Sequence, residues 1–199
     1  MMYKLMFLSY MASALLYGGG IVSALKRKET AVSALRWFGL AALLAGLAVG
    51  IYIMTTSWID TGHPPFQTLY QSLIFFSATT ALVFLYAGRR ILVMGVITTL
   101  FILAILAYGF VKKDVDSVEL PPALQSAWFI PHVVVYFLGY SALFVSFVTS
   151  ILYLIFPRAK ELPSADLLGL DSLDFNVYSY KSILFGYAMI SAGLILGAL

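Results

Sequence analysis

Six apolar segments, each long enough to cross a lipid bilayer, constrain this chain more than any other feature of its sequence. An α-helix rises about 1.5 Å per residue, so about 20 apolar residues span the ~30 Å hydrocarbon core. No Asp or Glu interrupts any of the six segments. They run approximately over Tyr3–Leu25, Ala34–Thr56, Leu69–Ala87, Ile91–Phe110, Pro131–Phe156 and Ser182–Leu199. The pattern predicts an all-α polytopic membrane protein with six transmembrane helices, in which residues 1–199 form a single membrane domain.

The basic residues indicate how these helices are oriented. Nine of the 12 Lys and Arg residues lie at the connections between the first and second, third and fourth, or fifth and sixth segments, counting Arg36 at the start of the second segment. Cytoplasmic connections are enriched in Lys and Arg, so these three connections are predicted to be cytoplasmic and the N-terminus to lie outside. Segments 57–68 and 111–130 are then outer loops, and the leucine-rich segment 157–181 suits a short interfacial helix on the cytoplasmic side. We expect a multi-pass membrane protein.

The composition excludes several classes of function. With 62% hydrophobic and 11% charged residues, the chain has too little polar surface for an ordinary soluble domain. It has no cysteine, which excludes disulfides and thiolate metal ligands. Its net charge of +3 comes from residues at helix ends, so no nucleic-acid partner is expected. The lack of an acid within the apolar segments argues against an ion-coupled transporter, and the sequence halves show no internal repeat.

His132 is the candidate functional residue, because it is the one histidine within an apolar segment. Pro131 suits the first position of a helix, which would make His132 the second residue and place its imidazole at one mouth of the membrane. Trp128 and Tyr136 lie four residues to either side, so an aromatic stripe shares the face of His132. A flat apolar ligand would suit that face. The plain alternative is an interfacial histidine within an aromatic belt.

A second histidine, His63, lies in the outer loop 57–68 directly before Pro64 and Pro65. The two prolines prevent a helix there, and the nearby Trp58 and Phe66 are expected to hold the loop against the membrane surface. A loop histidine before a proline pair is usually plain surface, so we assign His63 no ligand role.

Three stretches, in this order and at similar spacings, resemble the CcsA/ResC family of System II cytochrome c biogenesis. They are GHPPFQTLYQSLIFFS, LPPALQSAWFIPHVVVYFLGYSALFVSFVTSILYL and LDSLDFNVYSYKSILFGYAMISAGLILGAL. The resemblance covers most of the chain from Trp58 onward. Thr68 and Gln71 depart from it, because Asn and Glu are commoner at those positions in the family.

The resemblance implies a membrane protein that works with a CcsB/ResB-like partner to bring haem to the outer, periplasmic face, where it is attached to apocytochrome c. The haem would be b-type, non-covalently held and transient. In the family, a tryptophan-rich WWD loop is flanked by two outward-facing histidines that ligate the iron. His132 falls where the first of these belongs, with Trp128 beside it, and outer-loop aromatic residues such as Trp58, Phe66 and Phe129 would shelter the macrocycle.

One departure from the family is large. The WWD loop is expected directly after the end of the last apolar segment, and the sequence ends there at Gly197, Ala198 and Leu199. We therefore expect an N-terminal piece of a longer protein, or one product of a split gene, that needs a WWD-bearing segment or chain. Alone it should not catalyse haem attachment. The alternative function is a structural or anchoring subunit of a respiratory or transport complex, in which His132 only packs at the interface.

Overall fold

The computed structural model describes residues 1–66, 68–111, 126, 128–156, 158, 161–170 and 175–198. Every regular element in these ranges is a helix, and six of the helices are long and apolar enough to cross a membrane. This confirms the predicted fold class. The helices are α1 (Met2–Leu25), α2 (Glu29–Thr61), α3 (Leu69–Ala87), α4 (Leu92–Val111), α5 (Phe129–Ile155), the short α6 (Ala165–Leu168) and α7 (Phe175–Gly197).

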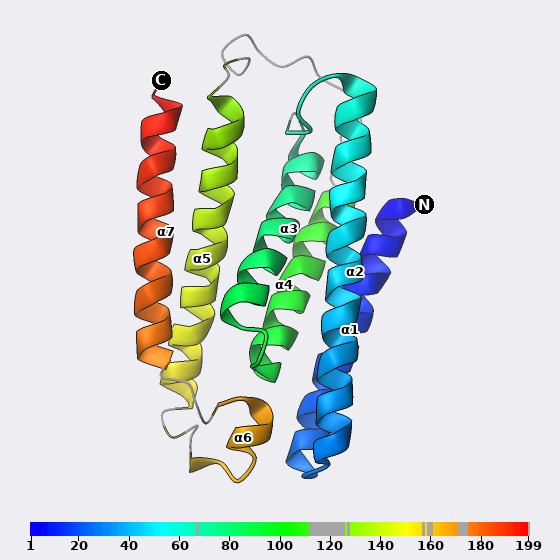
Figure 1. Cartoon of the computed structure of the whole chain (residues 1–199), viewed down its shortest axis with the longest axis vertical. Coiled ribbons are helices and arrows are strands. Elements are labelled where there is room, and N and C mark those ends of the chain that lie inside the picture. Colours follow the sequence, from blue (N-terminus) through cyan, green and yellow to red (C-terminus); the bar gives the residue numbers. More distant parts are fainter. Residues whose placement is uncertain are drawn as a thin grey trace.

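The long helices run alternately up and down, so the connections gather at two ends of the molecule (Figure 1). The α1–α2 and α3–α4 turns and the α6 segment lie at one end, which we call the basic end because it carries Lys26, Arg27, Lys28, Arg89 and Arg90. The α2–α3 connection and the start of α5 lie at the other end, which we call the histidine end. The two ends differ in charge as the sequence predicts.

Helices α1 to α4 form a bundle in which buried tyrosines of α1 lie over glycines of neighbouring helices. A Cβ added to Gly46 of α2 would lie 3.0 Å from the Tyr10 ring, and one added to Gly95 of α4 would lie 2.7 Å from the Tyr17 ring. Both tyrosine rings are fully buried. Small residues therefore let these helices approach closely. This is usual in membranes, where the hydrophobic effect does not drive helices together and association depends on close packing.

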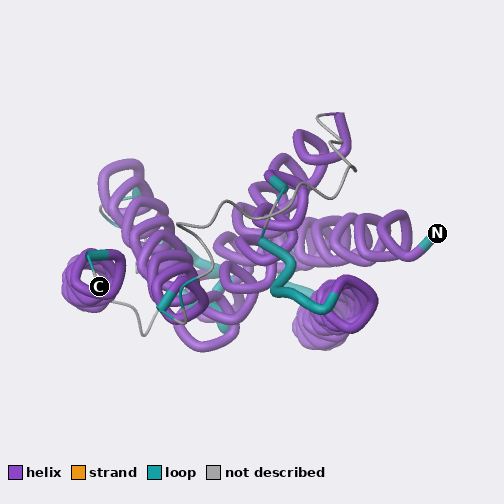
Figure 2. Tube along the Cα trace, turned by 90° about the horizontal axis from the view of Figure 1, so that it is seen from above, coloured by secondary structure: helices purple, strands orange, loops and turns teal. Residues whose placement is uncertain are grey.

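Helices α5 and α7 form an antiparallel pair, and α7 packs principally against α5 at the edge of the molecule (Figure 2). Their contact is a glycine seam. A Cβ added to Gly139 of α5 would lie 2.8 Å from Ile190 Cγ1, and one added to Gly186 of α7 would lie 2.9 Å from Leu143 Cδ2. Towards the basic end, the Ser179 hydroxyl lies 3.0 Å from that of Ser146. This seam positions α7 against His132.

The helix bounds differ from the sequence-based ones where apolar segments continue into polar sequence. Helix α2 begins at Glu29 and ends at Thr61, so it extends five residues beyond each predicted end. Helix α7 begins at Phe175, seven residues before the predicted start. Hydropathy marks the part of a helix that faces lipid, whereas the helix itself continues until a breaker such as Gly62, which has a φ of 74°.

The polar segment before α7 is fastened to the first two helices at the basic end. Arg27 donates a hydrogen bond to the Pro163 carbonyl at 3.1 Å, and Arg36 donates one to the Leu167 carbonyl at 2.8 Å. Leu168 and Leu170 are buried. The short helix predicted near these leucines is α6, whereas Leu173 lies outside the described residues.

Candidate functional site around His132

His132 lies in the first turns of α5 at the histidine end. The helix begins at Phe129, so Pro131 is its third residue and His132 its fourth. This corrects the predicted position of Pro131 as the first helical residue. The proline is tolerated because the first four N–H groups of a helix have no intrahelical partner. The His132 N–H then donates to the Trp128 carbonyl at 3.0 Å.

The imidazole of His132 is held by the neighbouring helix. Its Nδ1 atom lies 2.8 Å from the carbonyl oxygen of Gly193 in α7. A carbonyl oxygen only accepts, so Nδ1 carries the proton and donates it. In the neutral ring the other nitrogen, Nε2, then keeps its lone pair. This is how metal-binding histidines are commonly oriented, with one nitrogen held by a backbone carbonyl and the other available for the metal.

Two glycines of α7 and one aromatic ring of α5 form the seat of this imidazole. A Cβ added to Gly197 would lie 2.5 Å from His132 Cε1 and 2.6 Å from its Nδ1, so no larger residue fits without moving the ring. A Cβ added to Gly193 would lie 2.6 Å from the Tyr136 ring. The Tyr136 and His132 rings lie 4.7 Å apart between centroids. We call His132, Tyr136, Gly193 and Gly197 the imidazole seat.

The sequence predicted only part of this seat. Tyr136 was expected on the face of His132, and the ring contact confirms it. Gly193 and Gly197 were not expected to touch the histidine. Gly193 follows Gly186 by seven residues and Gly197 follows Gly193 by four, so all three glycines lie on one face of the helix. That spacing is the signal that could have identified the close packing of α7. The partner helix could not be read from it.

Trp128 caps α5 at its N-terminus and is half exposed, with 48% of its surface accessible. Its backbone carbonyl receives the His132 N–H, and its own N–H donates to the Ser126 hydroxyl at 3.2 Å. Its indole therefore lies beside the histidine end with a free surface. A role in binding a ligand stays a prediction for both Trp128 and His132.

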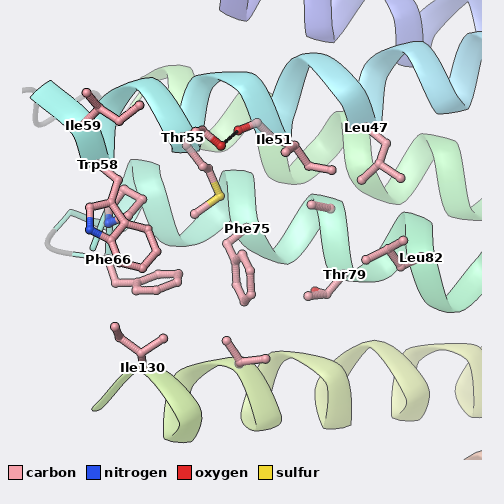
Figure 3. A pocket seen from close by; sticks show the side chains of 14 residues that line it. Leu47, Ile51, Thr55, Trp58, Ile59, Phe66, Phe75, Thr79, Leu82 and Ile130 are labelled. Atoms are coloured by element: carbon pink, nitrogen blue, oxygen red, sulfur yellow. Dashed lines mark hydrogen bonds between the residues drawn. The ribbon is translucent and has the colours of Figure 1, made fainter. Parts of the chain in front are cut away.

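An apolar cavity of about 630 Å³ lies at the same end of the molecule, between α2, α3 and α5 (Figure 3). Trp58 and Phe66 line it, together with Ile130 and Val134 of α5. His132 lies midway between these last two in sequence, about 200° around the helix, and contacts α7 instead. Trp58 and Phe66 thus line a cavity on the side of α5 opposite the imidazole, and a role for them around a ligand of His132 stays a prediction.

The other candidate residues do not gather around His132. His63 follows α2 in the loop, where its carbonyl accepts a hydrogen bond from Thr61 at 3.1 Å. Pro64 and Pro65 lie outside any helix, as predicted. Within the described ranges, no three His, Cys, Asp or Glu side chains come close enough to form a metal site. His132 is thus not part of a cluster of three or more such side chains among the described residues.

Comparison with known proteins identifies the family. The model of the cytochrome c assembly protein family matches residues 66–199, which include the imidazole seat. The chain is 30% identical over 179 residues to the cytochrome c biogenesis protein CcsA of Guillardia theta, covering 78% of this chain and 59% of that protein. It is 35% identical over 106 residues to CcsA of Chlorella vulgaris, covering 51% and 34% of the two chains.

The match with CcsA of Atropa belladonna is 29% identical over 178 residues and covers 73% of this chain and 57% of the relative. The chain therefore spans between about a third and three fifths of the length of these relatives. No solved structure matches it significantly. Because the family model covers well over half of the residues, this chain belongs to the cytochrome c assembly protein family.

Proposed function

We propose that this chain acts in cytochrome c biogenesis and helps to hold or deliver haem at the outer membrane face for covalent attachment to apocytochrome c. In this proposal His132 is an axial ligand of the haem iron through Nε2. The observation that supports it is the hydrogen bond from Nδ1 to the Gly193 carbonyl, which leaves Nε2 as the free nitrogen.

The residues present fit one half of such a site. The neutral imidazole is a common haem ligand, and its seat is half-buried at a helix end rather than sealed within the bundle. The ring is orientated by a backbone carbonyl and confined by Gly197, so little freedom remains to be lost on binding. The exposed indole of Trp128 offers a flat apolar surface close in sequence. Within the described part of the chain, no cluster of three or more His, Cys, Asp or Glu side chains supplies further ligands.

Haem, when bound, supplies the vinyl groups to which the cysteine thiols of apocytochrome c add. The contribution of this chain would be to bind the haem and to orient it. Gly193 holds the His132 proton on Nδ1, Gly197 limits the position of the ring, and the glycine seam fixes α7 against α5. A WWD-bearing segment or chain and a CcsB/ResB-like partner would complete the site. The haem would be b-type and non-covalently held, and the histidine end would face the periplasm of a bacterial inner membrane.

The test is the visible absorption spectrum of the chain purified from haem-replete cells, alone and with a WWD-bearing partner. We expect a Soret band with the partner that weakens about 10–100-fold in His132→Gly and returns with added imidazole. His63→Gly is the matched control and should keep the band. Haem that is absent from both preparations, or indifferent to His132, would contradict the proposal and favour an anchoring subunit.

A further inference from the structure

The basic end carries two adjoining hollows that the proposed haem function does not use. The first, the arginine hollow, has a volume of about 210 Å³ and is lined by Arg89, Arg90, Tyr86 and Tyr178, among others. The second, the apolar hollow, has a volume of about 740 Å³ and lies between α3, α5 and α7. Tyr86, Ala87 and Tyr178 line both, so the two hollows lie side by side.

Positive charge in the arginine hollow is not neutralised by the described protein. Arg89 and Arg90 are exposed, and the only ion pair among described side chains joins Arg158 to Glu161 at 3.9 Å. No carboxylate occurs among the described residues that line either hollow. Lys181 adds a third cation at the rim of the apolar hollow. Guanidinium groups bind phosphate oxygens in a bidentate manner, so this hollow suits a phosphate group.

The apolar hollow lies where the α5–α7 pair meets the rest of the molecule. Ser141 of α5 bridges to α3 through hydrogen bonds with Thr79 at 3.0 Å and Thr80 at 3.3 Å. Around this bridge the walls of the apolar hollow are mainly apolar side chains such as Val83, Leu138 and Phe185. Leu82 lines both this hollow and the 630 Å³ cavity. Lining residues of the two cavities thus follow α3 from Ala87 to Phe75, about 18 Å, which exceeds the ~15 Å depth of one leaflet.

We propose that an anionic phospholipid occupies these hollows, with its phosphate between Arg89 and Arg90 and an acyl chain along α3. Basic pockets between transmembrane helices are suited to anionic headgroups, and the surrounding bilayer supplies the ligand. Haem is also an anionic amphiphile, but the described lining of the two hollows offers its iron no imidazole, thiol or thioether. The phenols of Tyr86 and Tyr178 are the remaining candidate ligands, so haemin is included as a competitor in the test. The lipid would fill the space between α3 and the α5–α7 pair and join the two parts of the fold.

The test is lipid retention by the full chain in a zwitterionic detergent, measured by native mass spectrometry. Phosphatidylglycerol and phosphatidylcholine of the same acyl composition are added separately. We expect one phosphatidylglycerol per chain, bound about 30-fold more tightly than phosphatidylcholine, because two arginines near a headgroup contribute about 1 kcal/mol each. Arg89→Gln combined with Arg90→Gln should abolish this preference. Leu138→Trp, which fills the apolar hollow, should weaken the binding of both lipids.

The matched control is Lys26→Gln combined with Lys28→Gln, which removes the same charge from the same end without touching either hollow. It should change the preference less than twofold, and an unchanged thermal midpoint in phosphatidylcholine will show that each variant is folded. Equal retention of the two lipids by the unmodified chain would overturn the proposal. If both double variants lost the preference for phosphatidylglycerol equally, the preference would come from the general surface charge of this end and not from a binding site, which would also overturn the proposal. Full displacement by inorganic phosphate or by haemin would assign the hollows to those ligands instead.

Discussion

At the scale of single residues, Gly197 is tightly constrained at the candidate site, because its missing side chain is what admits the His132 imidazole. A methyl group there would stand 2.5 Å from Cε1 and 2.6 Å from Nδ1, well inside contact distance. The obstacle is a ring already bonded to the Gly193 carbonyl, so the ring must turn and lose that bond. Gly193 acts differently, since its added Cβ would meet Tyr136 and not the histidine.

We therefore predict that Gly197→Ala weakens haem retention about 10–100-fold, the range expected when the group that orients a metal ligand is disturbed. Its effect should vanish in a His132→Gly background, because the methyl group then has no ring to displace. The measurement is a double-mutant cycle on haem retention, with a coupling energy of about 1–3 kcal/mol. Gly18→Ala, whose added Cβ has nothing within 4 Å, is the control and should show no such coupling.

A second measurement tests the role of the imidazole seat in haem-free protein, independently of the proposal that His132 binds haem. The chain has two histidines, so ¹⁵N-labelled histidine gives few ring signals, and those of His132 are assigned by comparison with His63→Gly. In haem-free protein, we expect the proton of His132 on Nδ1. Gly197→Ala should give a ring that exchanges between the two tautomers. A fixed Nδ1 proton in that variant would contradict the role of Gly197, whatever the haem spectra show.

At the scale of elements, the attachment of α7 depends on the glycine seam. A Cβ on Gly139 would lie 3.2 Å from the Gly186 carbonyl and 3.3 Å from the Ile190 nitrogen, in addition to the Ile190 side chain. Backbone atoms cannot turn away as a side chain can, so the helices must separate. We predict that Gly139→Val lowers the free energy of unfolding by about 1–3 kcal/mol and speeds amide hydrogen exchange in α7.

Gly18→Ala is the matched control for this variant, because nothing lies within 4 Å of its added Cβ. It should leave exchange in α7 unchanged and stabilise α1 slightly, since alanine is the better helix former. Slow exchange in α7 of Gly139→Val would mean that α7 is held by something other than the seam.

The elements also show how far sequence reasoning reaches. Hydropathy identified all six spans, because a bilayer demands long apolar helices whatever their neighbours are. It misplaced the ends of α2 and the start of α7, where helix continues into polar sequence. For the site, spacing along one helix placed Tyr136 beside His132. It could not place Gly193 and Gly197 there, because contacts between helices distant in sequence depend on packing. For the same reason, the sequence did not reveal that Trp58 and His132 lie on opposite sides of α5.

At the scale of the whole molecule, the separation of charge and imidazole between two ends predicts a single orientation. Among the residues that the structure describes, the basic end carries Arg27, Arg36, Arg89 and Arg90. The Lys or Arg residue nearest the histidine end, among these described residues, is Lys4. Moving such a cluster across a membrane is unfavourable, so we predict that the basic end is cytoplasmic. Trp58 and Ile130 line one cavity, so the end of α2 and the start of α5 lie on the same side.

The absence of cysteine from the chain makes this orientation directly measurable. Thr61→Cys, at the exposed end of α2, should react in intact cells with a maleimide that cannot cross the membrane. Leu162→Cys, exposed at the basic end, should react only after the cells are opened. Neither substitution alters a charge, so the topogenic signal is preserved. The reverse pattern would place His132 on the cytoplasmic side, where it could not present haem to an outer substrate, and would exclude the proposed function even if haem binds.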